Sequence, residues 1–265
     1  MKPYLTLASI LFAAVVAPGQ DAQGGFNRTL NVSGPVELDS ITDSGGISVI
    51  AGPAGVVNIR AVLKAHKGWP LNGNVEDRIR RIERNPPVDQ SGNRIRIGHV
   101  SDPALFKGIS MRLEIQAPVD TRVRAEADSG GVRVEGIKGS VECKTDSGGI
   151  RISDVQGSVY ARADSGGIEA IGVAGPIDIA TDSGGIRIEQ TKAAAIRARA
   201  DSGGAHLRLA RNEGYELTLS SDSGRVSTPA LDAGASVSRN RASGKLRGGG
   251  PVVNVDVDSG QIVVD

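Results

Sequence analysis

The sequence predicts an all-β fold, a single-domain parallel β-solenoid with about 18 residues and two strands in each coil. The first observation is the tetrapeptide Asp-Ser-Gly-Gly, whose first aspartates from Asp128 to Asp222 lie 18, 18, 18, 19 and 21 residues apart. A fixed period near twenty indicates stacked structural units. The second is the alternation of apolar and polar residues between these turns, which is typical of strands. The third is composition: 36 glycines and only 3% aromatic residues suit many tight turns around a core of small aliphatic side chains.

One repeat, residues 146–163, shows why the units stack. After the turn, Ile150 and Ile152 face one side and Arg151 the other, and a second strand at residues 158–163 returns the chain to the next turn. A single repeat cannot bury its apolar faces, but successive repeats can bury them in one continuous core. The equivalent inward positions are Val132, Ile150, Ile168, Ile186 and Ala205 on one strand, and Val141, Val159, Ile177 and Ile196 on the other. The outward positions on the first strand are Arg133, Arg151, Glu169, Arg187 and His206.

The start of the chain has the features of a secretory signal peptide, residues 1–19. Lys2 supplies a positive end, residues 4–16 form an apolar run, and small residues precede a cleavage point near Gly19. A membrane anchor is the alternative, but the run is short for a bilayer. We therefore expect an exported protein, located in the periplasm, on the cell surface or in the medium, with no transmembrane segment in the mature chain.

Residues 20–127 are predicted to form an N-terminal β region that continues into the solenoid repeats of residues 128–265. An insertion at about residues 64–92 departs from the strand pattern. Within it, Val75, Ile79 and Ile82 fall at helical spacing after Asn74, a possible N-cap, and predict a helix over residues 75–84. Its arginines would suit an anionic partner, but a solvated helix face is the commoner role and is favoured here.

Stacking the turns would place their aspartates in a column, where neighbouring carboxylates ~4.8 Å apart repel by about 0.9 kcal/mol in water. We expect each carboxylate to offset this repulsion by accepting backbone N–H hydrogen bonds in its own turn. The alternative is a calcium-binding β-roll, but Ca²⁺ prefers six to eight oxygen ligands, and one aspartate per coil is sparse. We therefore assign no metal site and interpret the aspartates as a structural turn motif: Asp43, Asp128, Asp146, Asp164, Asp182, Asp201, Asp222 and Asp258.

The sequence gives little indication of a catalytic, metal-binding or nucleic-acid-binding site. His66, His99 and His206 are scattered, and Cys143 falls at an inward position, where it is expected to be a small buried hydrophobe. A formal net charge of +1 argues against a nucleic-acid partner, which needs a concentrated basic face. A β-helix glycosidase or polysaccharide lyase would need a converging acid and base, which the repeats do not suggest. No catalytic residue and no cofactor are predicted; a shallow sugar- or phosphate-binding sheet is an alternative to solvated outward residues.

Two stretches carry a resemblance to a known family. Residues 111–118, Met-Arg-Leu-Glu-Ile-Gln-Ala-Pro, and residues 128–134, Asp-Ser-Gly-Gly-Val-Arg-Val, with its later echoes, resemble the bacterial putative adhesin family. Its members are exported β-strand-repeat proteins whose shared domain has no settled function. The resemblance covers roughly residue 26 to the end and implies a surface or envelope ligand, a glycan or a protein, without implying any site residue. The expectation is an adhesin-like, non-enzymatic binding or structural module of the bacterial cell envelope; the alternatives are a carbohydrate-active β-helix enzyme and a calcium-binding β-roll.

Overall fold

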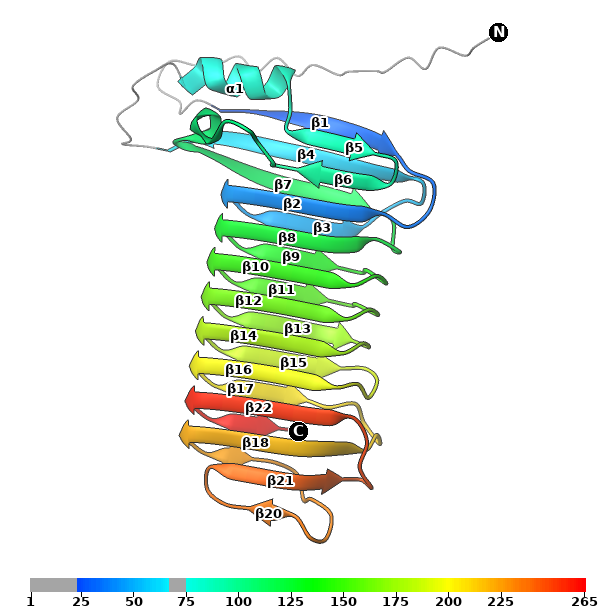
Figure 1. Cartoon of the computed structure of the whole chain (residues 1–265), viewed down its shortest axis with the longest axis vertical. Coiled ribbons are helices and arrows are strands. Elements are labelled where there is room, and N and C mark those ends of the chain that lie inside the picture. Colours follow the sequence, from blue (N-terminus) through cyan, green and yellow to red (C-terminus); the bar gives the residue numbers. More distant parts are fainter. Residues whose placement is uncertain (1–22, 67–74) are drawn as a thin grey trace.

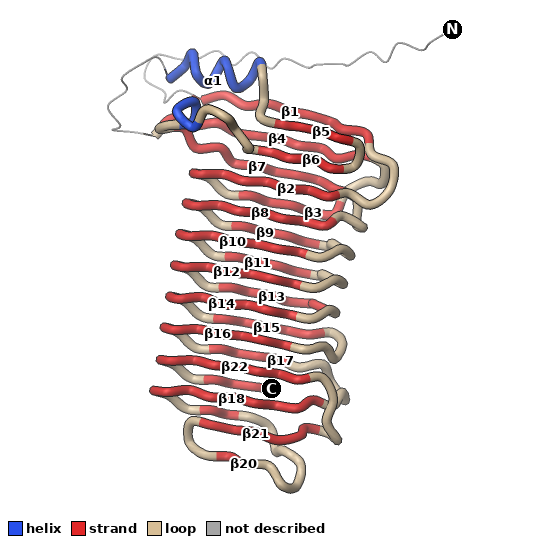
Figure 2. The backbone as a smooth tube through the Cα atoms, viewed as in Figure 1, coloured by secondary structure: helices blue, strands red, loops and turns tan. Residues whose placement is uncertain are grey.

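The computed structural model describes residues 23–66 and 75–265, so the predicted signal peptide and Asn74 lie outside the described residues. The described chain forms two long sheets that face each other across a flattened solenoid (Figures 1 and 2). Sheet A has eleven strands and sheet B has twelve. The predicted parallel β-solenoid is confirmed.

The central coils repeat one unit: a long strand in sheet B, the Asp-Ser-Gly-Gly turn, and a short strand in sheet A. Neighbouring coils pair in parallel and in register, so that Ile150 lies opposite Ile168. Ile150, Ile168 and Ile186 are at most 3% exposed, as expected, whereas Arg151 and Arg187 face solvent. The strands are β8 (Arg122–Ser129), β9 (Val132–Glu135), β10 (Val141–Ser147), β11 (Ile150–Ser153), β12 (Val159–Ser165), β13 (Ile168–Val173), β14 (Ile177–Ser183), β15 (Ile186–Gln190), β16 (Ile196–Ser202) and β17 (Ala205–Arg208).

Cys143 lies in this core. Its side chain is fully buried on β10, opposite Ala125 and Ala161 of the neighbouring coils. Burial raises the pKa of the Cys143 thiol well above its ordinary value, because the thiolate would lose its hydration. The residue is a small buried hydrophobe, as the sequence predicted.

The N-terminal region adds one coil and then a cap. Strands β2 and β3 pair in parallel with β8 and β9, so the first Asp-Ser-Gly-Gly turn stacks on a coil some eighty residues later in the sequence. Beyond this coil, β7, β4 and β1 extend sheet A, and β6 and β5 extend sheet B. The elements are β1 (Gln23–Asn31), β2 (Glu37–Ser44), β3 (Ile47–Ala51), β4 (Val56–Ala65), α1 (Val75–Arg84), β5 (Val88–Ser91), β6 (Arg94–Ile97), the 3₁₀-helix η1 (Pro103–Phe106) and β7 (Ile109–Ala117).

Helix α1 has the predicted bounds, Val75–Arg84, and lies over this end of the stack (Figure 1). Its three apolar residues are buried, and Glu83 accepts a hydrogen bond from the backbone N–H of Gly25 at 2.9 Å. Arg78 donates to the carbonyl of Lys107 at 2.7 Å, and Arg80 lies 3.0 Å from Asp77. Arg80, Arg81 and Arg84 are exposed, which fits the favoured solvated helix face, whereas Arg78 is partly buried and held by the Lys107 carbonyl. No helix in the two described ranges is long and apolar enough to cross a bilayer.

The C-terminal coils depart from the expected sequence order. Strand β22 lies between β16 and β18, and β23 lies between β17 and β19, so the last coil of the sequence is the second last of the stack. Residues 242–244, Ala-Ser-Gly, resemble a degenerate copy of the turn motif, but they form no coil, because β21 pairs antiparallel with β18 at this end of the stack. The strands are β18 (Tyr215–Ser223), β19 (Val226–Ser227), β20 (Ser236–Val237), β21 (Arg241–Leu246), β22 (Val252–Ser259) and β23 (Ile262–Val264).

Candidate binding surface on the outer face of sheet A

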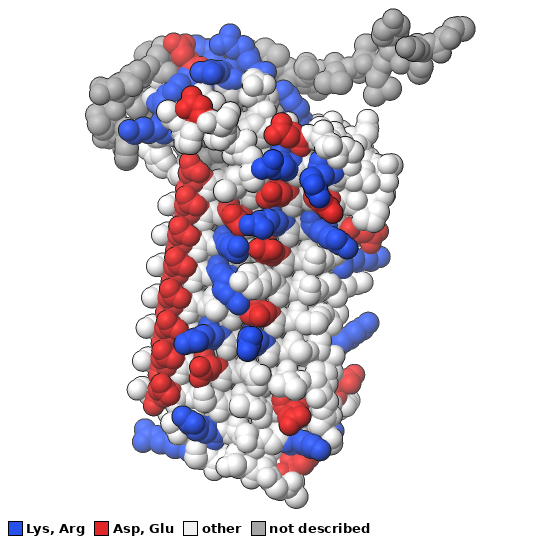
Figure 3. Space-filling model, in the orientation of Figure 1, with Lys and Arg blue, Asp and Glu red and all other residues white. Residues whose placement is uncertain are grey.

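The aspartates of the turns form one column. The serines that follow them pair from coil to coil, which fixes the order of the column in space. Figure 3 shows it as an acidic stripe along one edge of the solenoid. The order is Asp43, Asp128, Asp146, Asp164, Asp182, Asp201, Asp258 and Asp222.

The expected hydrogen bonds to these carboxylates are not made: within the described ranges, none of the eight accepts one. In the six complete Asp-Ser-Gly-Gly turns, the first glycine already donates its N–H to the adjacent coil, as Gly148 does to the carbonyl of Ser165 at 2.9 Å. Four of the eight turns are also held by a hydroxyl on the residue before the aspartate. Thr145 donates to the carbonyl of Gly130 in the neighbouring coil at 3.0 Å, and Thr181 and Ser221 make equivalent bonds between coils. Thr42 donates to the carbonyl of Gly45 within its own turn.

The exposed carboxylates therefore stay in water and repel one another. Partial burial raises the pKa of Asp128, and the neighbouring charges of Asp146 and Asp43 raise it further. In the described part of the chain, no three His, Cys, Asp or Glu side chains are grouped so that they could hold a metal ion. The histidines stay apart: His66 contacts Ser44 at 3.0 Å and His206 contacts Asp265 at 2.7 Å.

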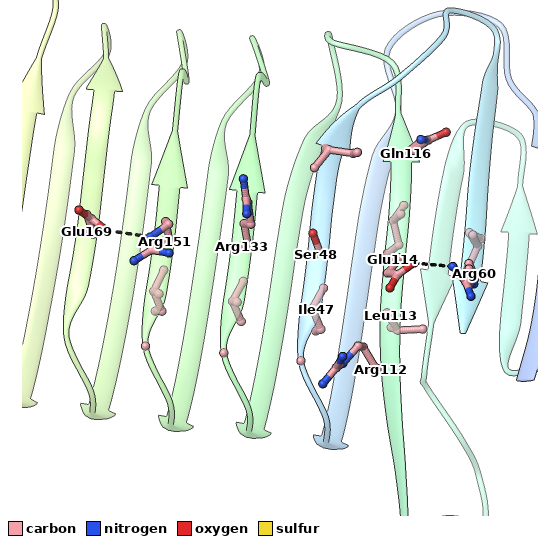
Figure 4. A pocket seen from close by; sticks show the side chains of 18 of the residues that line it. Ile47, Ser48, Arg60, Arg112, Leu113, Glu114, Gln116, Arg133, Arg151 and Glu169 are labelled. Carbon is pink, nitrogen blue, oxygen red and sulfur yellow. Dashed lines mark hydrogen bonds and ion pairs between the residues drawn. The ribbon is translucent and has the colours of Figure 1, made fainter. Parts of the chain in front are cut away.

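A groove of about 1250 Å³ follows the outer face of sheet A from β1 to β15. Figure 4 shows side chains of β4, β7, β3, β9, β11 and β13 turned toward it. We call this surface the sheet A groove. Its polar and glycine lining consists of Asn27, Arg28, Thr29, Gly46, Ser48, Asn58, Arg60, Arg112, Glu114, Gln116, Gly131, Arg133, Gly149, Arg151, Gly167, Glu169, Gly185 and Arg187.

Positive charge is in excess in the sheet A groove, since arginines line it at six positions and glutamates at two. Arg60 pairs with Glu114 at 3.4 Å, and Arg151 pairs with Glu169 at 2.7 Å (Figure 4). Arg133 pairs with Glu135 of its own strand at 2.5 Å.

Two further arginines of the groove, Arg112 and Arg187, form no ion pair with any described residue. Arg133 and Arg151 lie directly opposite each other on adjacent strands. Like charges in that position are unfavourable unless an anion or solvent screens them. Arg133 and Arg151 are each paired with a glutamate, whereas Arg112 and Arg187 offer guanidinium groups without an ion-pair partner in the described residues to an anionic ligand.

The two glutamates of the groove are not placed for acid–base catalysis on a glycosidic bond. Glu114 is on β7 and Glu169 is on β13, four strand steps apart in sheet A, which corresponds to roughly 19 Å. Glycosidases place their two carboxyl groups about 5–9.5 Å apart. Each glutamate is also held by an arginine.

Sequence reasoning found part of this surface. It assigned Arg133, Arg151, Glu169 and Arg187 to one outward row, and the register confirms that row. It missed Arg112 and the other groove residues of β1, β4 and β7. The alternation Met-Arg-Leu-Glu-Ile-Gln at residues 111–116 was the available signal, but it does not say which coil β7 joins.

The chain was compared with curated proteins, with solved structures and with protein families. No curated protein matches it. Two solved structures match it weakly. One is a putative cell adhesion protein from Clostridium sporogenes, with 11% identity, 91% of this chain and 99% of that chain covered, and a TM-score of 0.34. The other is a putative adhesin from Bacteroides fragilis, with 12% identity, 91% of this chain and 97% of that chain covered, and a TM-score of 0.35. Residues 96–265, more than half of the sequence, match a family described as Toastrack DUF4097, and the chain belongs to that family of unknown function.

Proposed function

We propose that this chain is an exported, non-enzymatic binding module of the bacterial cell envelope, which attaches to an envelope or surface ligand through the sheet A groove. The observation that carries the proposal is the groove itself, a long surface with exposed arginines on a rigid sheet. The resemblance to the adhesin family and the membership of the Toastrack family support a binding or structural role.

A carbohydrate-active enzyme is the less favoured function. Catalysis at a glycosidic bond needs an acid and a base on either side of the substrate. The groove glutamates are ~19 Å apart by strand count. A calcium-binding β-roll is also less favoured, since the aspartate column supplies one carboxylate per coil whereas Ca²⁺ takes six to eight oxygens.

A binding screen on the mature chain, residues 20–265, tests the proposal. The protein would be passed over immobilised glycans and insoluble cell-wall preparations, with a double Arg133→Gln/Arg187→Gln variant alongside. The matched control is Arg197→Gln, which removes an exposed arginine from the outer face of sheet B. We expect retention of the wild type and the control and loss of retention in the double variant.

Three results would contradict the proposal. Release of reducing ends from a polysaccharide would indicate an enzyme. A large rise in melting temperature with calcium, removed by a chelator and by Asp164→Asn, would indicate a β-roll. Retention that is equal in all three proteins would place attachment away from the sheet A groove.

A further inference from the structure

The two glycines of each turn differ in what they require. At the first, Gly148, φ is +150°, and a Cβ atom would lie 2.4 Å from the carbonyl oxygen of Gly130 in the neighbouring coil. No side chain fits there. At the second, Gly149, φ is outside the left-handed region, and a Cβ atom would lie 3.3 Å from the carbonyl oxygen of Gly167. The second position is tight but not closed to a side chain.

The chain itself shows that side chains are accommodated at the second position. The two coils at the C-terminal end of the stack carry Gln261 and Arg225 there, and both are exposed. Their carbonyls accept the same bond between coils as the glycine: Ala205 N–H donates to Gln261 at 2.9 Å and Ile262 N–H donates to Arg225 at 2.9 Å, compared with 3.0 Å from Ile150 to Gly167. The solenoid backbone therefore does not require glycine at this position in every coil.

Where the second position is glycine, the outer face of sheet A has a lane without side chains. This glycine lane is Gly46, Gly131, Gly149, Gly167 and Gly185, all of which line the sheet A groove. It runs along the stacking axis, across the strands. Gly204 continues the row in the coil of β17, and beyond it Gln261 and Arg225 fill the corresponding positions, so the lane is open as far as β17 and closed after it.

Arginines border the glycine lane. Two residues after the lane glycines, on the same face of the strands, is a row of Ser48, Arg133, Arg151, Glu169 and Arg187. Glu169 lies between Arg151 and Arg187 and pairs with Arg151 at 2.7 Å, so the row carries three positive charges and one negative charge. Arg112 stands at the N-terminal end of the lane, one residue before Leu113, whose N–H bonds to the carbonyl of Gly46 at 2.9 Å. Arg133 and Arg151 are one strand step apart, ~4.8 Å, and Arg187 lies two steps beyond Arg151. Guanidinium groups at this spacing suit the carboxylates or phosphates of a linear polymer, which they bind in bidentate fashion.

The shape and composition of the groove select among polyanions. Among the described residues, no aromatic side chain lines it, so this surface lacks the stacking platforms that single-stranded nucleic acids use. It is the face of a sheet rather than an edge, so a peptide strand could not add to it by backbone hydrogen bonds. Uncharged hydrogen-bonding groups are present at its N-terminal end, where Thr29 donates to Asn58 at 2.9 Å beside Gln116. Such groups suit sugar hydroxyls.

We propose that the glycine lane holds one chain of an acidic polysaccharide, parallel to the solenoid axis, with its carboxylate or phosphate groups on Arg112, Arg133, Arg151 and Arg187. This inference rests on the proposed function and names its ligand class. The lane gives the polymer close approach to the sheet, and the arginines give it charge neutralisation.

Calorimetric titration of the mature chain with oligogalacturonate tests the proposal, with its methyl ester as the neutral probe. Gly149→Gln places in the lane the side chain that Gln261 already has in its own coil. We expect this variant to bind oligogalacturonate about tenfold or more weakly, with an unchanged melting temperature. The glutamine side chain would hold the polymer away from the sheet, and the charge-assisted hydrogen bonds between its carboxylates and the arginines would be lost. Arg133→Gln/Arg187→Gln should weaken binding similarly, the control Arg197→Gln should not, and affinity should fall with added salt.

The outcomes separate this inference from the proposed function. If the methyl ester bound equally well, or if a folded Gly149→Gln variant kept wild-type affinity, the proposal that an acidic polysaccharide binds in the glycine lane would be wrong. If cell-wall retention persisted in that variant and still depended on Arg133 and Arg187, the proposed function would stand without the acidic polysaccharide. If the mature chain neither bound oligogalacturonate nor was retained by any glycan or wall preparation, both would be overturned.

Discussion

The central coils and the C-terminal coils use the same repeat but stack it differently. From β8 to β17, the order in space follows the order in sequence. In the C-terminal coils, the chain leaves β19, reverses through β20 and β21 against β18, and returns to place β22 and β23 inside the stack (Figure 1). Ala205, Ile262 and Val226 still lie in one inward row. Coils are therefore interchangeable in register, and the connections between them decide their order.

The reversal has a structural consequence for the end of the stack. A parallel solenoid that simply stopped would leave a long unpaired edge, which favours aggregation. Here β21 covers the edge of β18 in antiparallel orientation, and the short β20 follows it. The N-terminal end is similar, because β4 pairs antiparallel with β7 and β1 with β4. Antiparallel strands thus cap both ends, as repeat proteins require.

The largest effect is expected from deleting residues 252–265. This removes a coil that pairs on both sides and buries Val253, Val255, Val257, Ile262 and Val264. Five buried aliphatic side chains contribute on the order of 10 kcal/mol, comparable with the net stability of a whole domain. Because coils interact with their nearest neighbours, we expect residues 215–246 to lose hydrogen-exchange protection while β10–β15 keep theirs. Full protection of β18 in the truncated chain would show that the inserted coil is dispensable.

A buried charge should distinguish a central coil from a terminal one. Ile168 has a coil on either side and is 1% exposed, whereas Val226 is on the short edge strand β19, pairs with β23 alone and is 8% exposed. Ile168→Asp should cost roughly 3–5 kcal/mol, since it leaves an uncompensated charge in the core. Val226→Asp should cost about 1–2 kcal/mol, mainly from lost apolar burial. Urea unfolding of both variants measures the difference; equal costs would mean that end coils are packed as firmly as central ones.

Most of the fold could be predicted from the sequence, because the nearly constant repeat length determines which residues lie opposite each other in neighbouring coils. Period, inward rows and the helix at Val75–Arg84 all follow from local patterns. The place of β22 could not be predicted, since its inward valines match those of any coil and only the path of the connection selects its neighbours. Only part of the groove could be predicted, for the same reason. Arg133 and Arg151 belong to the periodic repeats, so their common row follows from the repeat length. Arg112 lies on β7, outside the periodic repeats, so its position beside β3 could not be predicted from the repeat length.

The smallest effect on stability is expected in the aspartate column, where Asp128, inside the column, is compared with Asp222 at its end. Asp128 stands between Asp43 and Asp146, and its pKa is raised by partial burial and by both neighbours; Asp222 ends the column beside Asp258 alone. A raised pKa means that the folded state binds the proton more tightly than the unfolded state, so stability falls as pH rises above about 3.8, the ordinary value for aspartate. Asp128→Asn should remove this loss and stabilise the protein at pH 7 by roughly 0.3 kcal/mol, because the charges are mostly solvated.

At pH 3 the Asp128→Asn variant and the wild type should differ little, since the aspartate is protonated in both states. Asp222→Asn should gain less than Asp128→Asn at pH 7, and the gain of both should shrink in 1 M salt, where the Debye length is about 3 Å. Urea melts at the two pH values and two salt concentrations measure these differences. Destabilisation of Asp128→Asn at pH 7 would mean that the carboxylate accepts a favourable contact, either a turn hydrogen bond or a bound cation. Repeating the melt with chelator would then separate the two, because only the cation contact is lost on chelation.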